Sequence, residues 1–114
     1  MRKIALPAAL ALGVPAFATA GEWAGTWAAE PAWCDGNGEG APVRITTEAM
    51  HGLGNVCEIT NVSPTGVERS WRFDMSCSGE GMPYRTSELV MLTRDGGLAR
   101  FTEDGILVPM VRCE

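Results

Sequence analysis

The chain has 114 residues, a length that fits one domain, and its 9 Lys and Arg against 14 Asp and Glu give a formal net charge of −5. This acidic balance excludes a general binder of nucleic acids or anionic membranes, because such proteins need a basic face. With 20% charged and 46% hydrophobic residues, the composition also excludes a disordered chain and an integral membrane protein.

The first twenty residues have the three parts of a secretory signal peptide. Arg2 and Lys3 precede the uncharged apolar stretch 4–17, and an A-x-A cleavage site ends at Ala20. The apolar stretch is shorter than the roughly 20 residues that a membrane-spanning helix needs. We therefore expect export, cleavage after Ala20, and a periplasmic or secreted mature chain 21–114 that forms a single domain without a transmembrane segment.

Loss of this leader would leave a more acidic mature chain. Removing Arg2 and Lys3 lowers the count of Lys and Arg from nine to seven, while all 14 Asp and Glu remain, so the side-chain charge becomes −7. The acidic residues are scattered along the chain rather than gathered in blocks, which favours a role in solubility over the steering of a basic partner.

A glycine-rich acidic segment follows the first predicted strand, which contains Trp27. The segment 35–40, DGNGEG, resembles the first half of a calcium loop, in which oxygen ligands stand at alternate positions. The twelfth position of such a loop would be Thr46, which has no carboxylate. We therefore interpret 35–40 as a loop between strands and expect no metal, with calcium binding as the open alternative.

Residues 43–46 alternate between apolar and polar side chains, which predicts a short strand. The next stretch, 47–54, fits either a strand or one helical turn. Thr47 can cap such a turn, but Gly52 and Gly54 would end it at once.

The middle of the chain predicts a β-hairpin. Residues 70–77 alternate between an apolar and a polar set, as a half-buried strand does, and residues 57–60 alternate in the same way. A turn at 63–66, with the sequence SPTG, joins the two strands. Folding about this turn places Cys57 opposite Cys77.

Three more strands are predicted at 84–93, 98–102 and 106–113, joined by tight turns at Asp95-Gly96-Gly97 and Asp104-Gly105. The first of these ends in an apolar run, which is typical of a strand covered on both faces. Pro109 indicates an edge, a bulge or a break in the last one. With about seven to eight short strands and no sustained helical period, we predict an all-β fold, a small antiparallel up-and-down barrel or sandwich.

All four cysteines, Cys34, Cys57, Cys77 and Cys113, lie in the mature chain, and an even number in a short exported protein indicates disulfides. The spacing excludes structural zinc, since no C-x-x-C pair occurs and His51 is the only histidine. Four cysteines allow three pairings. The predicted hairpin selects Cys57–Cys77, which leaves Cys34–Cys113 to tie the first strand to the last.

The motif Gly25-Thr26-Trp27 in the first predicted strand, with Arg112 in the last, resembles the signature of the calycins, which include lipocalins and bacterial inhibitors of secreted metalloproteases. The resemblance implies a small exported barrel in which Arg112 packs over Trp27. Two features depart from it. Only residues 21–24 precede the motif, whereas the inhibitors insert a longer N-terminal segment into the protease. The mature domain is also much shorter than a ligand-carrying lipocalin, so side chains can fill its interior.

The sequence predicts no enzyme and no cofactor. His51 lies in a turn-like stretch without a nucleophile elbow, and disulfides that use every cysteine leave no free thiol. The carboxylates of Glu80, Glu88, Glu103 and Asp104 fall in turns or on strand surfaces, where solvated acids belong.

We therefore expect a monomeric, non-catalytic binding module whose partner is an exported protein, with inhibition of an exported hydrolase as its specific form. The alternative is a binder of a small apolar ligand or an envelope component, which would use exposed aromatic residues such as Trp23, Trp33 or Tyr84. A large interior cavity would favour this alternative, and a filled barrel with an exposed aromatic-rich rim would favour a protein partner.

Overall fold

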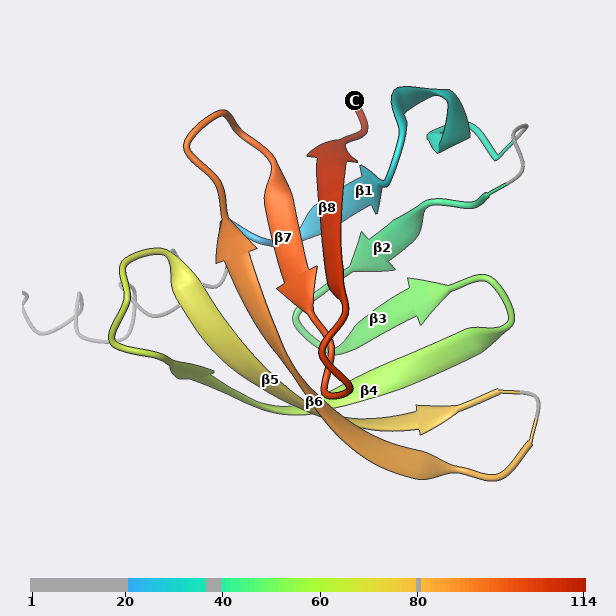
Figure 1. The fold of residues 1–114 in the computed structure, drawn as a ribbon. Coiled ribbons are helices and arrows are strands. Elements are labelled where there is room, and N and C mark those ends of the chain that lie inside the picture. Colours follow the sequence, from blue (N-terminus) through green and yellow to red (C-terminus); the bar gives the residue numbers. More distant parts are fainter. Residues whose placement is uncertain (1–20, 37–39, 80) are drawn as a thin grey trace, which may run out of the picture.

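The computed structural model describes residues 21–36, 40–79 and 81–114, so the predicted signal peptide at 1–20 lies outside the described residues. Eight strands follow one another around a closed antiparallel barrel (Figure 1). The all-β prediction is confirmed, and the fold is the barrel rather than the sandwich because the last strand pairs with the first. The elements are β1 (Gly25–Ala28), the short 3-10 helix η3 (Pro31–Trp33), β2 (Val43–Ile45), β3 (Ala49–Gly52), β4 (Asn55–Pro64), β5 (Ser70–Ser78), β6 (Tyr84–Leu92), β7 (Leu98–Phe101) and β8 (Leu107–Arg112).

The closure between β1 and β8 explains how a strand can contain a proline. The ladder ends with the pair Ala28 and Val111, and beyond it the main-chain N–H of Cys113 donates to the oxygen of Thr26 at 2.8 Å. Alternate residues of a strand point their N–H groups to the same side. The nitrogen of Pro109 therefore points toward the β1 side, as the N–H of Cys113 does, but at a level where β1 has already ended. The missing N–H of Pro109 therefore removes no bond of the ladder, as its predicted edge position requires.

The ambiguous stretch 47–54 forms β3 rather than a helical turn. Met50 is buried in the barrel, and the strand pairs with β2 on one side and β4 on the other. The hydroxyl oxygen of Thr46 accepts the N–H groups of Glu48 and Ala49 at 3.1 Å, which stabilises the turn before the strand. Pairing on both sides thus overrides a weak local helix signal.

The predicted hairpin exists, but its turn comes later than predicted. β4 continues through Pro64, which pairs with Trp71, so the placement of the turn at 63–66 is wrong. A β-bulge in the middle of β4 adds one residue and keeps the apolar side chains of both halves inside the barrel. Cys57 therefore still comes opposite Cys77.

Both predicted disulfides are confirmed. Cys34–Cys113 ties the segment after η3 to the end of β8, and Cys57–Cys77 joins β4 to β5. Two such bonds are consistent with an oxidising compartment. Within the described part of the chain, no helix is long and apolar enough to cross a membrane.

Side chains fill the interior of the barrel. Trp23 meets Phe73 edge to face, with ring centres 4.8 Å apart. This packing agrees with the expectation from the short mature chain that side chains occupy the core of the barrel. The largest fully buried side chains are those of Trp23, Trp27, Phe73, Ile45, Leu98 and Val90.

Candidate binding site

The three residues of the predicted signature come together where β1 meets β8. The guanidinium carbon of Arg112 lies 4.1 Å from the centre of the Trp27 ring. Its nitrogens donate to the main-chain oxygens of Ala24 at 3.2 Å and Glu22 at 3.0 Å. Gly25 is required because its φ is +144° and a Cβ there would come within 2.6 Å of the guanidinium. The cluster closes this end of the barrel, and such a small eight-stranded barrel is compatible with a calycin-like fold.

The three aromatic residues predicted for binding have different surroundings. Trp23 is only 1% exposed, so its prediction as an exposed aromatic is wrong. Its ring packs against Phe73, and its main-chain oxygen accepts the indole N–H of Trp27 at 3.1 Å. Trp33 is half-buried, whereas Tyr84 at the start of β6 is 51% exposed. Of the three, Tyr84 is therefore the one that solvent reaches freely.

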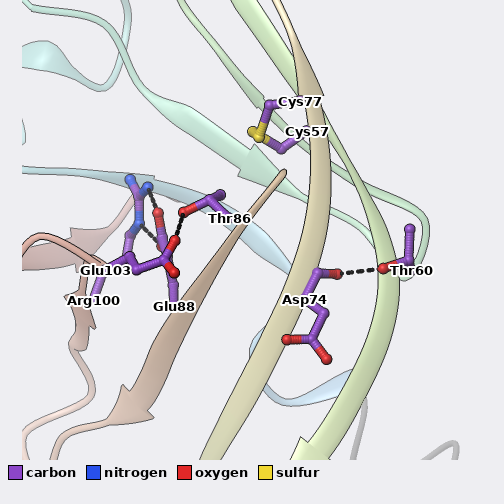
Figure 2. The surroundings of a disulfide bond; sticks show 8 residues. All are labelled: Cys57, Thr60, Asp74, Cys77, Thr86, Glu88, Arg100 and Glu103. Atoms are coloured by element: carbon purple, nitrogen blue, oxygen red, sulfur yellow. Dashed lines mark hydrogen bonds and ion pairs between the residues drawn. A yellow bond between two sulfur atoms is a disulfide. The ribbon is translucent and has the colours of Figure 1, made fainter. Parts of the chain in front are cut away.

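A buried ion pair lies toward the other end of the barrel, away from Arg112. Glu88 in β6 accepts hydrogen bonds from Nε and Nη2 of Arg100 in β7, at 2.8 and 2.7 Å (Figure 2). The prediction of Glu88 as a solvated surface acid is wrong, because it shares the inward side of β6 with Val90 and is only 7% exposed. The charge of Arg100 makes this burial tolerable.

An open depression of about 450 Å³ lies at this end of the barrel. Figure 2 shows the neighbouring Cys57–Cys77 disulfide and the hydroxyl of Thr86, which donates to the carboxylate of Glu103 at 3.0 Å. A lining with so many polar groups does not suit a small apolar ligand. The lining residues are Asn55, Cys57, Tyr84, Arg85, Thr86, Glu88, Arg100, Thr102, Glu103 and Asp104.

β6 extends well beyond its partner β7 (Figure 1). The ladder between them covers only Leu89–Leu92, whereas β5 pairs with β6 down to Tyr84. In the described part of the chain, the segment 84–88 therefore has a strand on one side and none on the other. The chain leaves β7 at Phe101 and turns back toward β8 instead of continuing along β6.

The direction of the main-chain groups shows which of them face this open side. The N–H of Leu92 donates to the main-chain oxygen of Arg69, just before β5, at 3.0 Å. The N–H of Thr93 points the other way and donates to the main-chain oxygen of Gly97, just before β7, at 2.9 Å. Because the direction alternates along a strand, Arg85 and Ser87 direct their N–H and C=O groups away from β5. We call these main-chain groups of Arg85 and Ser87 the free β6 edge.

An apolar surface continues beside this edge on the outside of the barrel. Leu89, Phe101 and Leu107 stand opposite one another across β6, β7 and β8 and are 46%, 42% and 52% exposed. The apolar run in 84–93 predicts a strand covered on both faces, but the described residues leave this outer side open. We define the outer apolar face by the outward positions Leu89, Met91, Ala99, Phe101, Leu107, Pro109 and Val111.

The outside of β5, by contrast, is polar around Asp74. Its carboxylate accepts hydrogen bonds from the hydroxyl of Ser87 at 2.7 Å, from Nε of Arg72 at 3.0 Å and from the amide of Asn61 at 3.4 Å. The bond from Ser87 and then that from Arg72 lower the pKa of Asp74 below its ordinary value. These contacts fix the side chain of Ser87 and leave its main chain at the free edge.

Of the other residues weighed for chemistry, Glu103 and Asp104 line the same depression as Glu88, whereas His51 does not. His51 is half-buried in β3, and Glu103 and Asp104 are exposed in the β7–β8 turn, as predicted for acids in turns. Among the described residues, no group of three or more His, Cys, Asp or Glu side chains is placed to hold a metal ion. Glu80 and residues 37–39 of the loop considered for calcium lie outside the described residues.

Comparison with protein-family models, curated proteins and solved structures finds no match for this chain. The sequence predicts Tyr84 as a binding residue but misses the free β6 edge at Arg85 and Ser87. The signal for this edge is the difference in length between the predicted strands 84–93 and 98–102.

Proposed function

We propose that this chain is a non-catalytic binding module for an exported protein partner. The observation that carries the proposal is the outer apolar face, with the row Leu89, Phe101 and Leu107 exposed to solvent. An apolar patch bordered by polar residues is typical of the central part of a protein–protein interface. The packed core supports the same choice, because its apolar side chains are already in contact with one another and the exposed apolar side chains lie on the outside of the barrel.

Inhibition of an exported hydrolase is the specific form of binding that we propose. A small barrel with two disulfides is a rigid framework, and rigid partners lose little conformational entropy on binding. We also propose kinship with the calycins, supported by the contacts among Gly25, Trp27 and Arg112.

Binding of a small apolar ligand is the second candidate and has less support. It would need an apolar cavity, whereas the depression beside Glu88 and Arg100 is lined largely by polar groups. Tyr84 is the exposed aromatic that such a ligand would have to use.

Site-specific photocrosslinking in cells that export the protein tests the proposal. The photoreactive amino acid p-benzoylphenylalanine replaces Leu107 on the outer apolar face or, as a matched control, Glu58 on the outside of β4; both positions are exposed in strands. We expect the Leu107 variant to give a covalent adduct with one defined exported protein, identified by mass spectrometry, and the Glu58 variant to give none.

Two results would overturn the proposal. The first is the absence of any adduct from Leu107 in a correctly folded, disulfide-bonded protein. The second is the same set of adducts from both positions, which would indicate random encounters rather than a specific interface.

A further inference from the structure

We propose that the free β6 edge binds an extended segment of the protein partner as an added β-strand. This inference rests on the proposed function and deepens it by naming the contact. β6 pairs with β7 at Met91–Ala99 and Leu89–Phe101. Ser87 is the next residue along β6 whose main-chain N–H and C=O groups point away from β5. A partner strand would continue the line of β7 from the point where this chain turns away.

The edge is available for such pairing. The hydroxyl of Thr102 accepts the N–H of Ile106, so this side chain is engaged in its own turn. The contact that reaches from this turn to the segment 84–88 joins the side chains of Thr86 and Glu103, not the main chain. An edge with unpaired main-chain groups is the usual attachment site in β-strand addition, and many proteins cover or shorten such edges to avoid it.

The two sides of the edge indicate the chemistry of the incoming strand. On the inner side lies the polar depression, whose charged lining is Glu88, Glu103 and Asp104 with Arg85 and Arg100. Glu88 and Arg100 neutralise each other, so the remaining side chains leave an excess of one negative charge. On the outer side lies a second depression of about 290 Å³, where the apolar side chains of Leu89 and Phe101 lie among polar residues. The polar lining residues are Arg72, Ser87, Glu88, Thr102 and Glu103. Side chains of a strand point alternately to its two sides. The partner segment that fits therefore alternates basic residues, facing inward, with apolar residues, facing outward.

Charge favours such a partner over a second copy of this chain. The chain carries a net charge of −5 and would bring its own acidic turn, with Glu103 and Asp104, close to the same turn of the other copy. Like charges that face each other oppose association, whereas basic side chains would be attracted. Pairing of two copies along their β6 edges is therefore the competing outcome of the test.

The experiment uses a defined probe, a seven-residue peptide of alternating lysine and valine with both ends blocked. It is added to isotope-labelled, disulfide-intact protein, and binding is followed by NMR through the amide signals of Arg85 and Ser87. The test variant is Arg85→Pro, which removes one N–H of the free edge. Its matched control is Arg85→Ala, which removes the same side chain and charge but keeps the N–H.

We expect the peptide to shift the amide signals of Arg85 and Ser87 and to slow their hydrogen exchange. The Arg85→Pro variant should bind at least tenfold more weakly than Arg85→Ala. A peptide with glutamate in place of lysine should bind more weakly than the lysine peptide, and added salt should reduce this difference. A lysine–valine peptide that is N-methylated at alternate positions should lose binding to the unchanged protein, which keeps the test valid even if Arg85→Pro fails to fold.

Equal binding by the Pro and Ala variants, unchanged binding of the methylated peptide, or shifts confined to residues away from β6 would overturn the inference. Sedimentation of the protein without peptide covers the competing outcome. A dimer that is present in Arg85→Ala and lost in Arg85→Pro would assign the edge to a second copy and also overturn it. A specific adduct from Leu107 together with no effect of Arg85→Pro would leave the proposed function standing and remove only this contact.

Discussion

Arg112 in the last strand lies over the ring of Trp27 in the first strand, with the guanidinium carbon 4.1 Å from the ring centre. The two residues also pair directly across the seam that closes the barrel. The cation–π contact and the apolar stem of the arginine act on the same buried ring, so their effects on stability are coupled.

This relationship predicts a non-additive pair of substitutions. Arg112→Ala should lower the free energy of unfolding by about 1–3 kcal/mol, and Trp27→Ala by about 3–5 kcal/mol because it also leaves a cavity. The double variant should lose less than the sum, since both changes remove one shared contact. Chemical denaturation of the four proteins measures this coupling, and additive losses would show that the contact contributes nothing of its own.

The two disulfides should differ in their effect on stability. Cys34–Cys113 spans 79 residues and Cys57–Cys77 spans 20. In the loop-entropy account, replacing the first pair by alanine costs about 4–5 kcal/mol, and replacing the second costs about 3 kcal/mol. Denaturation of the two double variants tests the order. A larger loss from the shorter loop would mean that local packing around β4 and β5 outweighs chain entropy.

The buried pair of Glu88 and Arg100 predicts an asymmetric response. Glu88→Ala leaves the guanidinium buried without its partner and should cost about 3–5 kcal/mol, whereas replacing both residues by leucine and methionine should recover most of that loss. The exposed pair of Arg72 and Asp74 is the control, and Arg72→Ala should cost no more than about 1 kcal/mol. Thermal or chemical denaturation gives the comparison; equal losses for Glu88→Ala and Arg72→Ala would contradict it.

The lowered pKa of Asp74 predicts how the stability of the folded protein depends on pH. Its pKa in the folded protein is lowered from the ordinary value of 3.8 by the hydrogen bonds from Ser87 and Arg72. A lowered pKa stabilises the folded state above the unfolded pKa, and this contribution disappears as the pH falls below 3.8 toward the folded value. The stability difference between the native protein and Asp74→Asn, measured from pH 6 to pH 2, should therefore shrink on acidification. A constant difference across this range would disprove the role of ionised Asp74.

Many strands and turns can be predicted from the sequence because the patterns that specify them are local. The strict alternation in 70–77 predicts both the strand and the inward direction of Cys77, and the Asp-Gly turns after β6 and β7 occur where they are predicted. Gly96 and Gly105 both have φ of +91°, which glycine adopts without strain.

The predictions that the structure contradicts concern residues whose surroundings are set by neighbours distant in sequence. Glu88 is buried because Arg100 comes beside it from the next strand, and Trp23 is buried because Phe73 receives its ring. The free β6 edge depends on where β7 ends, so it requires the pairing of two strands rather than the pattern of one. Residue types alone cannot fix such relationships, since the same Glu or Trp also fits an exposed site.

Native-state amide hydrogen exchange of the disulfide-intact protein tests the free β6 edge most directly. The N–H groups of Thr86 and Glu88 point to β5 and should exchange slowly, whereas those of Arg85 and Ser87 point to the open side and should exchange at least tenfold faster. We expect this alternation of slow and fast exchange over four consecutive residues. If the N–H groups of Arg85 and Ser87 were protected as strongly as those of Thr86 and Glu88, the β6 edge would already be covered and could not bind an added strand.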